Sequence, residues 1–425
     1  MTGAGRGTVV GLVRHESELL VVRRPESAPF PGRWDGITAD DDGDPATTAR
    51  EAVRDVTGAD PSVVRVGDRI AVRDAGDGLS DAPGTVTPVL LSAERRGTLP
   101  GAGLADWIAP PALRDRETVP WLLPAYEAVR PTPETVASDP EHGAATLSVR
   151  ALDALRDEAV VAAASDDARG GADGATDWAA LLDYARRLRD ARPSMPVVGN
   201  RVARAMDRAS DERTPAAVAA AASDSLDRAR QADDEAAARA ADRLGDRVVT
   251  LSRSGTVFAA LVSAAPEAVV VAESRPGGEG VGTAERVADA TDADVWLTTD
   301  AGVAPAVADR AVDTAVVGAD AILADGSVVN KVGTRALATV AAREKVDCLA
   351  VAASDKVAPG TDADREERDP AELYDGDAAV SVANPTFDVT PLGLFDAVVT
   401  ERGVLDGAAV RELAQAHRER RARLD

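Results

Sequence analysis

The feature that most constrains the fold is a series of short apolar runs in the last part of the chain. Segments with helical patterns separate most of these runs, which lie at residues 247–251, 268–272, 294–298, 314–318, 348–353 and 379–383. Continuous Val, Ala and Leu without alternation indicate strands that are buried on both faces. Strands that alternate with helices at this spacing are typical of a doubly wound, mostly parallel sheet. We therefore predict an α/β fold for this region.

The stretch before these runs has a helical pattern instead. Residues 144–243 contain long segments rich in Ala, Leu and Arg, and a Gly- and Asp-rich stretch at 165–177 predicts a flexible loop among them. A helical subdomain is the simplest interpretation. The Pro-, Thr- and Asp-rich residues 129–143 have the composition of a linker.

The first part of the chain has the pattern of a small, separate α/β unit. Two apolar runs flank a polar turn at His15–Ser17, which predicts a hairpin. A helix is expected next, with Asp44 as its N-cap and Gly58 at its end, before strand-like runs at 69–73 and 86–92. We predict three domains: an α/β domain at 1–128, a helical subdomain at 129–245 and a sheet domain at 246–425.

Charge and length narrow the classes of function. The chain has 425 residues and a net charge of −24, from 72 acidic and 48 basic side chains. Such a field repels polyanions, so we expect no direct nucleic-acid partner and no anionic membrane partner. Abundant Asp with very few Lys also resembles adaptation to high salt, which screens surface repulsion. No apolar run approaches the roughly 20 residues that span a bilayer, so we expect a cytoplasmic protein.

Cysteine and histidine are too sparse for most metal sites. The single cysteine, Cys348, excludes an internal disulfide framework and any zinc site built from several cysteines. Its apolar context, "KVDCLAVAA", predicts a buried strand residue. The three histidines are scattered along the chain, so we expect no histidine-based metal site.

Polar side chains follow the predicted strands at the points where each strand ends. Ligands of doubly wound sheets bind beyond these carboxyl ends, so the candidates are Ser252, Arg253, Ser254, Glu273, Ser274, Arg275, Asp300, Asp320 and Lys356. Asn330 and Lys331 join them, and Lys331 is one of only three lysines. Glycine-rich turns at helix starts bind phosphate together with Lys and Arg. Asp320 can act as an acid or base if burial raises its pKa. The set predicts a site for a phosphorylated small molecule.

Three separated motifs resemble one known family. "ESRP", "VVGADAILADGSVVNKVGT" and "NPTFDVTPLGLFDAVVTERGVL" look like the signature of the initiation factor 2B alpha, beta and delta subunits. The same family contains ribose-1,5-bisphosphate isomerase and 5-methylthioribose-1-phosphate isomerase. The resemblance covers roughly residues 130–425. It implies a helical subdomain, a Rossmann-like C-terminal domain, a sugar-phosphate pocket at the strand ends and a homo-oligomer, either a dimer or a larger assembly.

The resemblance also implies roles for individual residues. The isomerases use a cysteine and an aspartate for an aldose–ketose interconversion, and the aspartate corresponds to Asp320. Ser252 stands at the cysteine position, in "TLSRSGTV", and it is a poor substitute because an alkoxide forms far less readily than a thiolate near neutral pH. Substrate contacts are implied for Gly143, Ala144, Arg192, Arg253, Ser254, Arg275, Asn330, Lys331 and Lys356.

A second resemblance lies in the first 128 residues. The stretch from "PGRWDG" to "TGAD" is similar to the Nudix box, whose glutamates on one helix hold Mg²⁺ at a pyrophosphate. Asp55 is the acid at one glutamate position, whereas two others are occupied by Ala52 and Val56. The acidic loop at 40–44 is a further source of ligands. We expect a Nudix-like fold with a degenerate box that serves as a sensing or docking module, with Mg²⁺ as a cofactor only if the box is active.

The sequence leaves three functions open. The first is a protein related to initiation factor 2B that binds a phosphorylated sugar or nucleotide, with the Nudix-like domain as a regulatory module. The second is a sugar-phosphate isomerase of the ribose-1,5-bisphosphate type, with Asp320 as acid or base. The third is a Nudix hydrolase of nucleoside diphosphates. We favour the first because Ser252 replaces the cysteine. The family name alone implies a role in translation initiation.

Overall fold

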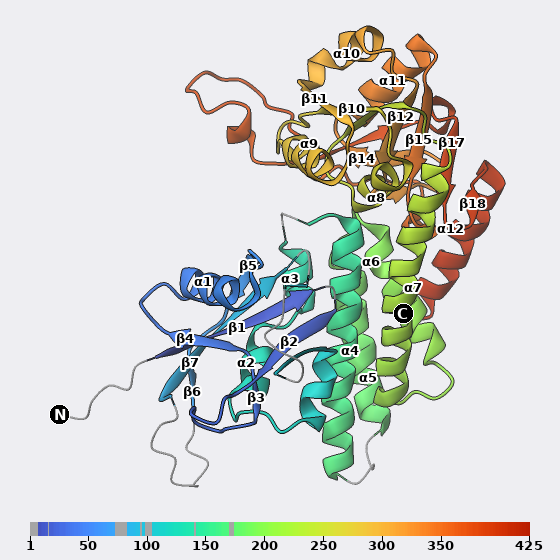
Figure 1. Ribbon diagram of the computed structural model, residues 1–425. Helices are drawn as coiled ribbons and strands as arrows, with labels where there is room; N and C mark the ends of the chain where they lie inside the picture. The colour runs from blue at the N-terminus through green and yellow to red at the C-terminus, as the bar shows by residue number, and fades with distance from the viewer. Residues whose placement is uncertain are drawn as a thin grey trace. The chain divides into compact units, whose positions relative to one another are not determined.

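The chain divides after residue 131 into two units, Met1–Pro131 and Thr132–Asp425. The computed structural model describes residues 7–15, 17–72, 83–93, 96–97, 104–139, 142–169 and 174–425. Figure 1 labels the helices and strands of both units. No helix among these residues combines the length and the apolar character that crossing a membrane requires.

The first unit is built on an eight-stranded mixed sheet whose main path has the order β3-β2-β1-β7-β5. Its central strands, β1 (Thr8–His15) and β7 (Thr85–Ser92), are parallel to each other. The others are β2 (Glu18–Arg23), β3 (Trp34–Asp35), β4 (Ile37–Asp40), β5 (Ser62–Val66), β6 (Ile70–Ala71) and β8 (Ala105–Ile108). Helices α1 (Pro45–Thr57) and α2 (Leu122–Val129) pack on opposite faces of the sheet.

The local structure around α1 agrees with the prediction from the sequence. Asp44 caps the helix by accepting a hydrogen bond from the Thr47 amide at 3.3 Å. Gly58 ends it in the left-handed conformation, with a φ of 66°. The expected hairpin is the antiparallel pair of β1 and β2. Short-range signals of capping and turn formation therefore predicted these elements correctly.

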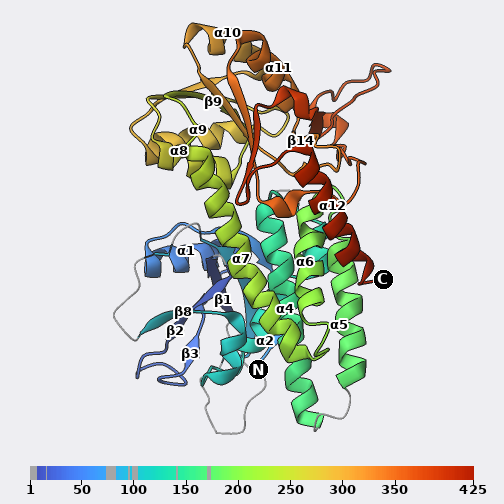
Figure 2. The same ribbon diagram turned by 90° about the vertical axis from the view of Figure 1, so that its right-hand side faces the viewer.

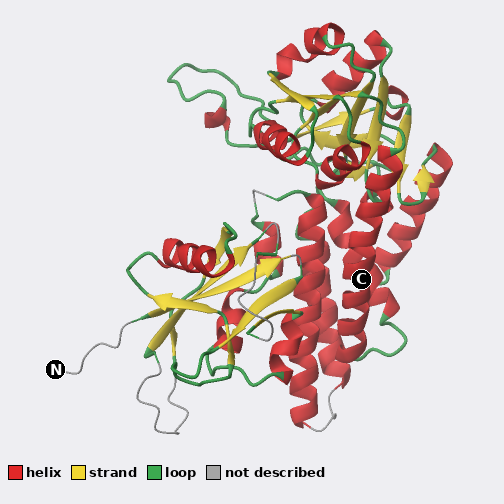
Figure 3. Ribbon diagram, viewed as in Figure 1, coloured by secondary structure: helices red, strands yellow, loops and turns green. Residues whose placement is uncertain are grey.

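The second unit begins with helices: α3 (Pro133–Ala137), α4 (Ala144–Arg169), α5 (Gly174–Arg189), α6 (Pro196–Arg208) and α7 (Pro215–Ala241). Figures 2 and 3 show α4 to α7 as a bundle of long helices, and α12 (Gly407–Ala422) packs against α6. The loop expected at 165–177 is wrong for most of its length, because α4 continues to Arg169 and α5 starts at Gly174. Residues 170–173 lie outside the described residues.

The strands of the second unit form a parallel sheet in the order β11-β10-β9-β12-β15-β17, with β18 (Gly403–Val404) antiparallel at the edge. Their bounds are β9 (Arg247–Leu251), β10 (Ala268–Ala272), β11 (Asp294–Thr298), β12 (Thr314–Gly318), β15 (Asp347–Val351) and β17 (Ala397–Thr400). In chain order this is the Rossmann arrangement 3-2-1-4-5-6. As predicted, β10 and β12 are buried along their whole length. The predicted burial is wrong for β11, which lies at the edge of the sheet and is largely exposed.

One predicted strand is wrong. Residues 379–383 form no strand, and the sixth parallel strand is β17 (Ala397–Thr400). Apart from the half-buried Val382, residues 379–383 are exposed, in a long segment that joins β15 to β16 (Phe387–Thr390). Figure 1 draws that segment as an orange loop which projects from the sheet. A short Val- and Ala-containing run predicts a buried strand only where tertiary packing covers it.

A small antiparallel sheet supplements the parallel one. Its order is β13 (Ala321–Ile322), β14 (Val328–Lys331) and β16 (Phe387–Thr390). The chain enters β13 directly after β12, through residues Ala319 and Asp320. This small sheet therefore brings Asn330 and Lys331 to the carboxyl ends of the parallel strands.

Candidate functional site

The candidate site lies where the strand order of the parallel sheet reverses. Strands β9, β10 and β11 follow one another toward one edge, whereas β12, β15 and β17 follow one another toward the other. The switch point is therefore between β9 and β12. Ser252 directly follows β9, and Asp320 lies two residues after β12. Ligands of such sheets bind in the crevice that forms at this point.

Asp320 has surroundings that favour the protonated form of its carboxyl group. Burial raises the pKa of its carboxyl group, and the neighbouring Glu366 raises it further. Lys356, a hydrogen bond from the Ala144 amide and Arg192 act in the opposite direction. Asp320 is half-buried as a residue, and its amide donates to the Val329 carbonyl at 2.9 Å. A carboxyl group with a raised pKa can hold a proton near neutral pH and give it to a substrate.

Lys356 is buried beside Asp320. Its Nζ donates to the carbonyl of Ala319 at 2.6 Å, and only 5% of the residue is exposed. The turn that carries it is held from α6: Asn200 Nδ2 donates to the carbonyls of Asp355 and Val357 at 2.8 and 2.9 Å. Arg201 and Arg204 both form ion pairs with the Asp355 carboxylate. The helical bundle thus fixes the position of the lysine.

Arg192 comes to the same place from the segment between α5 and α6. Its guanidinium donates to the Asp139 carbonyl at 2.6 Å and to the two carboxylate oxygens of Glu366 at 2.9 and 3.1 Å. Ser194 also donates to Glu366. Gly143 and Ala144 start α4, where Ala144 is buried. The structure therefore brings Asp320, Ala144, Arg192 and Lys356 together, although they are far apart in the sequence.

Asn330 and Lys331 are both buried at the end of β14. Asn330 Nδ2 donates to Thr334 Oγ1 at 2.9 Å. Lys331 Nζ lies 2.8 Å from Glu279 Oε1, and Glu279 is a residue that the sequence analysis did not select. The lysine expected to bind phosphate thus has a carboxylate partner already. The signal that could have found it is the acid in the glycine-rich turn "PGGEG".

Ser252 and Ser254 lie on the turn between β9 and α8 (Gly255–Ala264). Ser252 has a φ of 61°, and its amide donates to Ser274 Oγ at 2.6 Å. Ser254 caps α8 through the Val257 amide at 3.3 Å. A Cβ at Gly318 would lie 2.8 Å from Ser254 Oγ. The absence of a side chain at Gly318 thus lets the Ser254 hydroxyl approach β12, next to Asp320.

Two predicted contact residues point to solvent. Arg253 is exposed, and Arg275 is exposed with its Nε 3.3 Å from Glu273 Oε2. The Arg275 amide donates to Asp300, as does the Ser274 amide. The Asp300 carboxylate therefore holds the turn after β10 by accepting hydrogen bonds from two backbone amides of that turn.

Two residues considered in the sequence analysis have no place in this site. Cys348 is buried inside β15, where burial raises the pKa of its thiol to about 12. Asp55 is exposed on α1 in the first unit. Among the residues that the structure describes, no group of three or more His, Cys, Asp or Glu side chains could hold a metal ion. Mg²⁺ as a cofactor of an active Nudix box stays a prediction.

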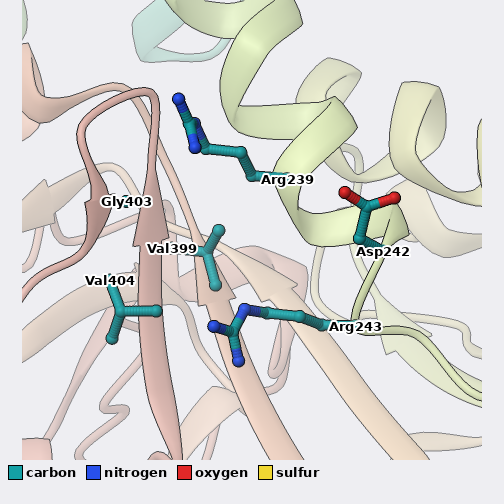
Figure 4. A pocket seen from close by; sticks show the side chains of 6 residues that line it. All are labelled: Arg239, Asp242, Arg243, Val399, Gly403 and Val404. Atoms are coloured by element: carbon teal, nitrogen blue, oxygen red, sulfur yellow. The ribbon is translucent and has the colours of Figure 1, made fainter.

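A hollow of about 360 Å³ lies elsewhere in the second unit. Its lining residues, shown in Figure 4, are Arg239, Asp242, Arg243, Val399, Gly403 and Val404. They come from the end of α7, the segment after it and the β17–β18 hairpin. None of the predicted site residues lines it.

Known proteins are similar to much of this chain. Ribose 1,5-bisphosphate isomerase of Haloferax volcanii is 36% identical over 297 residues, which are 65% of this chain and 88% of that protein. Methylthioribose-1-phosphate isomerase of Pseudomonas fluorescens is 37% identical over 171 residues, 38% of this chain and 48% of its own length. The solved structure of translation initiation factor eIF-2B from Pyrococcus horikoshii OT3 has a TM-score of 0.54 and 25% identity, and it matches 64% of this chain and 94% of its own.

The family model with the description "Initiation factor 2 subunit family" matches residues 140–407. That range contains the parallel sheet, the helices that hold Lys356 and every predicted contact residue of the site. The Nudix-like interpretation of residues 1–128 lies outside it and stays a prediction. The chain belongs to the Initiation factor 2 subunit family.

Proposed function

We propose that the chain is a sugar-phosphate isomerase that converts a pentose phosphorylated at C1 into the corresponding ketose. The observation that carries this proposal is the desolvated carboxyl group of Asp320 at the switch point of the sheet, with Lys356 and Arg192 beside it. The two kinds of isomerase to which the chain is similar are both named for pentose derivatives with a phosphate at C1. The proposal replaces the binding function that the sequence analysis favoured.

The residues around Asp320 suit both the opening of the sugar ring and the binding of the sugar phosphate. A pentose with a C1 phosphate stays in its ring form until a proton reaches the ring oxygen. A carboxyl group whose pKa is raised by burial can supply that proton. Lys356, Arg192 and the Ala144 amide provide positive charge and a hydrogen-bond donor for phosphate or hydroxyl oxygens. We infer that they orient the sugar against Asp320.

The test is a direct assay of the purified chain with ribose 1,5-bisphosphate and methylthioribose 1-phosphate at high salt. We expect formation of the ketose with one of the two substrates, followed by phosphorus and proton NMR. Ser252→Cys is the informative variant: a gain in turnover would place the residue at the reacting atoms. If neither substrate reacts with either protein, the isomerase proposal is wrong.

A second candidate function follows from Ser252 itself. The serine lacks the reactivity of a thiol, and some members of this family are subunits of initiation factors. A protein that binds a phosphorylated sugar or nucleotide without converting it would need the cationic side chains but not the acid. Thermal stabilisation by a sugar phosphate in a chain without turnover would favour this alternative. A homo-oligomeric assembly is proposed in either case.

A further inference from the structure

Glu279 places a further carboxylate beside the candidate site. Its Oε1 accepts a hydrogen bond from Lys331 Nζ at 2.8 Å. Its Oε2 is buried and has no hydrogen-bond partner among the residues that the structure describes. Buried carboxylate oxygens are nearly always hydrogen-bonded, and an exception requires an explanation such as a catalytic role or a bound ligand.

The backbone fixes Glu279 at the carboxyl edge of the sheet. It is the first residue of α9 (Glu279–Ala290), and a Cβ at the next residue, Gly280, would lie only 1.8 Å from the Ala272 carbonyl oxygen at the end of β10. A Cβ at Gly277 would lie 2.3 Å from Glu279 Oε1. Glycine at both positions therefore lets the helix start press against the strand and lets the carboxylate fold back over the turn.

Glu279 is also close in the chain to a residue that holds Ser252. One turn further along α9, Thr283 Oγ1 donates to the Ser252 carbonyl at 2.7 Å. Lys331 in turn follows Asn330, whose Oδ1 lies within 3.9 Å of a Cβ placed at Gly318. The ends of β9, β10, β12 and β14 thus place the Ser252 turn and the Glu279–Lys331 pair around the same switch point as Asp320.

We propose that Glu279 is the second proton-transfer group of this site and takes the part that Ser252 cannot perform. This inference rests on the proposed isomerase function. An aldose–ketose conversion moves one proton between two carbon atoms and others between oxygen atoms, so it needs two groups that can take up and release a proton during the reaction. A serine hydroxyl is not such a group, whereas a carboxylate is.

The proposal divides the protons between the two carboxyl groups. Asp320 gives its proton to the ring oxygen, and the C1–O bond to that oxygen breaks with its electron pair. Glu279 removes the proton from C2, and the C–H electron pair forms the C1=C2 double bond of an enol. Glu279 then returns its proton to C1, while the C2 hydroxyl gives its proton to Asp320 and becomes the ketone. Both groups recover their starting states, and the reaction needs no oxidant or reductant.

The pairing with Lys331 is compatible with this role. The ammonium group occupies Oε1 and orients the carboxylate, which leaves Oε2 for the proton. A purely structural ion pair would need no unpartnered oxygen.

The test compares Glu279→Gln with Glu285→Gln, an exposed glutamate on the same helix. We expect Glu279→Gln to lower kcat by at least about 100-fold, the usual loss for a proton-transfer group. Thermal stabilisation by ribose 1,5-bisphosphate should be kept or increased, since a charge beside Lys331 has been removed. Deuterium uptake at C1 in D₂O should fall with kcat. Glu285→Gln should match the wild type in all three measurements.

A Glu279→Gln protein with kcat within about threefold of the wild type would overturn the proposal, whatever its affinity. If that variant does not fold, Glu279→Asp decides, because it keeps the charge beside Lys331 but shortens the side chain. We expect it to lose at least about tenfold in kcat, and unchanged kcat would overturn the proposal. A wild type without turnover on any sugar phosphate overturns the isomerase function and this inference together, whereas an active wild type with an active Glu279→Gln overturns this inference alone.

Discussion

Both units of this chain contain carboxylates that the sequence analysis assigned to phosphate chemistry. The pKa values of these carboxylates shift in opposite directions in the folded chain. In the first unit, Asp42 and Asp44 are exposed, and hydrogen bonds from Thr48 and Thr47 hold the pKa of each below its ordinary value. In the second unit, burial raises the pKa of Asp320. The first pair stabilises the start of a helix, whereas Asp320 is prepared to exchange a proton.

The difference shows that a count of acidic residues does not identify a site. Asp42 accepts from the Asp44 amide and from Thr48 Oγ1, and Asp44 accepts from the Thr47 amide. The partners found for this pair among the described residues are thus all close in the chain. Asp320 is surrounded by groups from four separated segments, around residues 144, 192, 356 and 366. Convergence of distant segments, together with removal from water, is what makes a carboxyl group reactive.

The largest effect should follow removal of the acid. Asp320→Asn keeps the shape of the side chain but cannot give or take a proton, so we expect kcat to fall by about 10²–10⁴-fold, measured on ribose 1,5-bisphosphate. Asp289→Asn, an exposed position on α9, is the control and should be neutral. In the wild type, kcat should decline as the pH rises through the raised pKa of Asp320, because the proton donor is then lost. Full activity in Asp320→Asn would show that the buried carboxyl group is not the acid of the reaction, so that it would not differ in function from the exposed carboxylates of the first unit.

The next largest effect concerns ligand binding by lysine. A ligand at a hundredfold excess over its Kd stabilises the folded chain by about 2.7 kcal/mol. We expect Lys331→Ala to lose most of this stabilisation by ribose 1,5-bisphosphate. Lys345→Ala is the matched control, since Lys345 is exposed at the end of α11 (Thr334–Glu344). Equal stabilisation of both variants would mean that Lys331 does not contact the ligand.

A smaller effect should follow from pH, through His417 on α12. Burial, with Arg204 and Arg420 nearby, lowers the pKa of this histidine from 6.5 to about 3. The unfolded chain therefore binds a proton that the folded chain does not, so stability is lost as the pH falls below about 6.5. Between pH 7 and pH 5 the expected loss is about 2 kcal/mol. Chemical denaturation at the two pH values measures it.

The control for this effect is His417→Leu, which should show a smaller loss between pH 7 and pH 5 by about the same 2 kcal/mol. The unfolding transition must be assigned to the second unit, for example through its ligand-dependent shift. A variant with the same pH dependence as the wild type would show that other groups cause the loss.

The smallest effect should come from the first unit. Asp55 is exposed on α1, so Asp55→Asn should change the free energy of unfolding by less than about 0.5 kcal/mol. Addition of Mg²⁺ or of a chelator should not change the thermal stability of the wild type or of the variant. A Mg²⁺-dependent stabilisation that Asp55→Asn abolishes would instead revive the hydrolase interpretation of this unit.

Much of the fold could be predicted because its signals are local. Five of the six apolar runs became parallel strands, and the helices of the bundle appear within the residues that had a helical pattern. The sixth run, at 379–383, has a similar composition but no cover, so it is exposed in a loop. A sequence window cannot tell whether another part of the chain will bury it.

The candidate site could be predicted in part for the same reason. Asn330 and Lys331 lie at the end of a strand, and Asp320 and Lys356 lie in the segments that follow β12 and β15, where the parallel arrangement brings polar residues together. The ion pair between Lys331 and Glu279 could not be predicted, because it joins residues 52 positions apart. The same holds for the contact of Arg192 with Glu366, which are 174 positions apart.

The sequence by itself determined the alternation of strands and helices, the caps of α1 and the kinds of side chain available at the strand ends. These depend on hydrophobic period and on hydrogen bonds between near neighbours. Only the tertiary structure decided which carboxyl groups lose their water and which cations have partners. Desolvation and ion pairing depend on segments that meet through packing, so Asp320 and Glu279 acquire their chemistry only when the chain is folded.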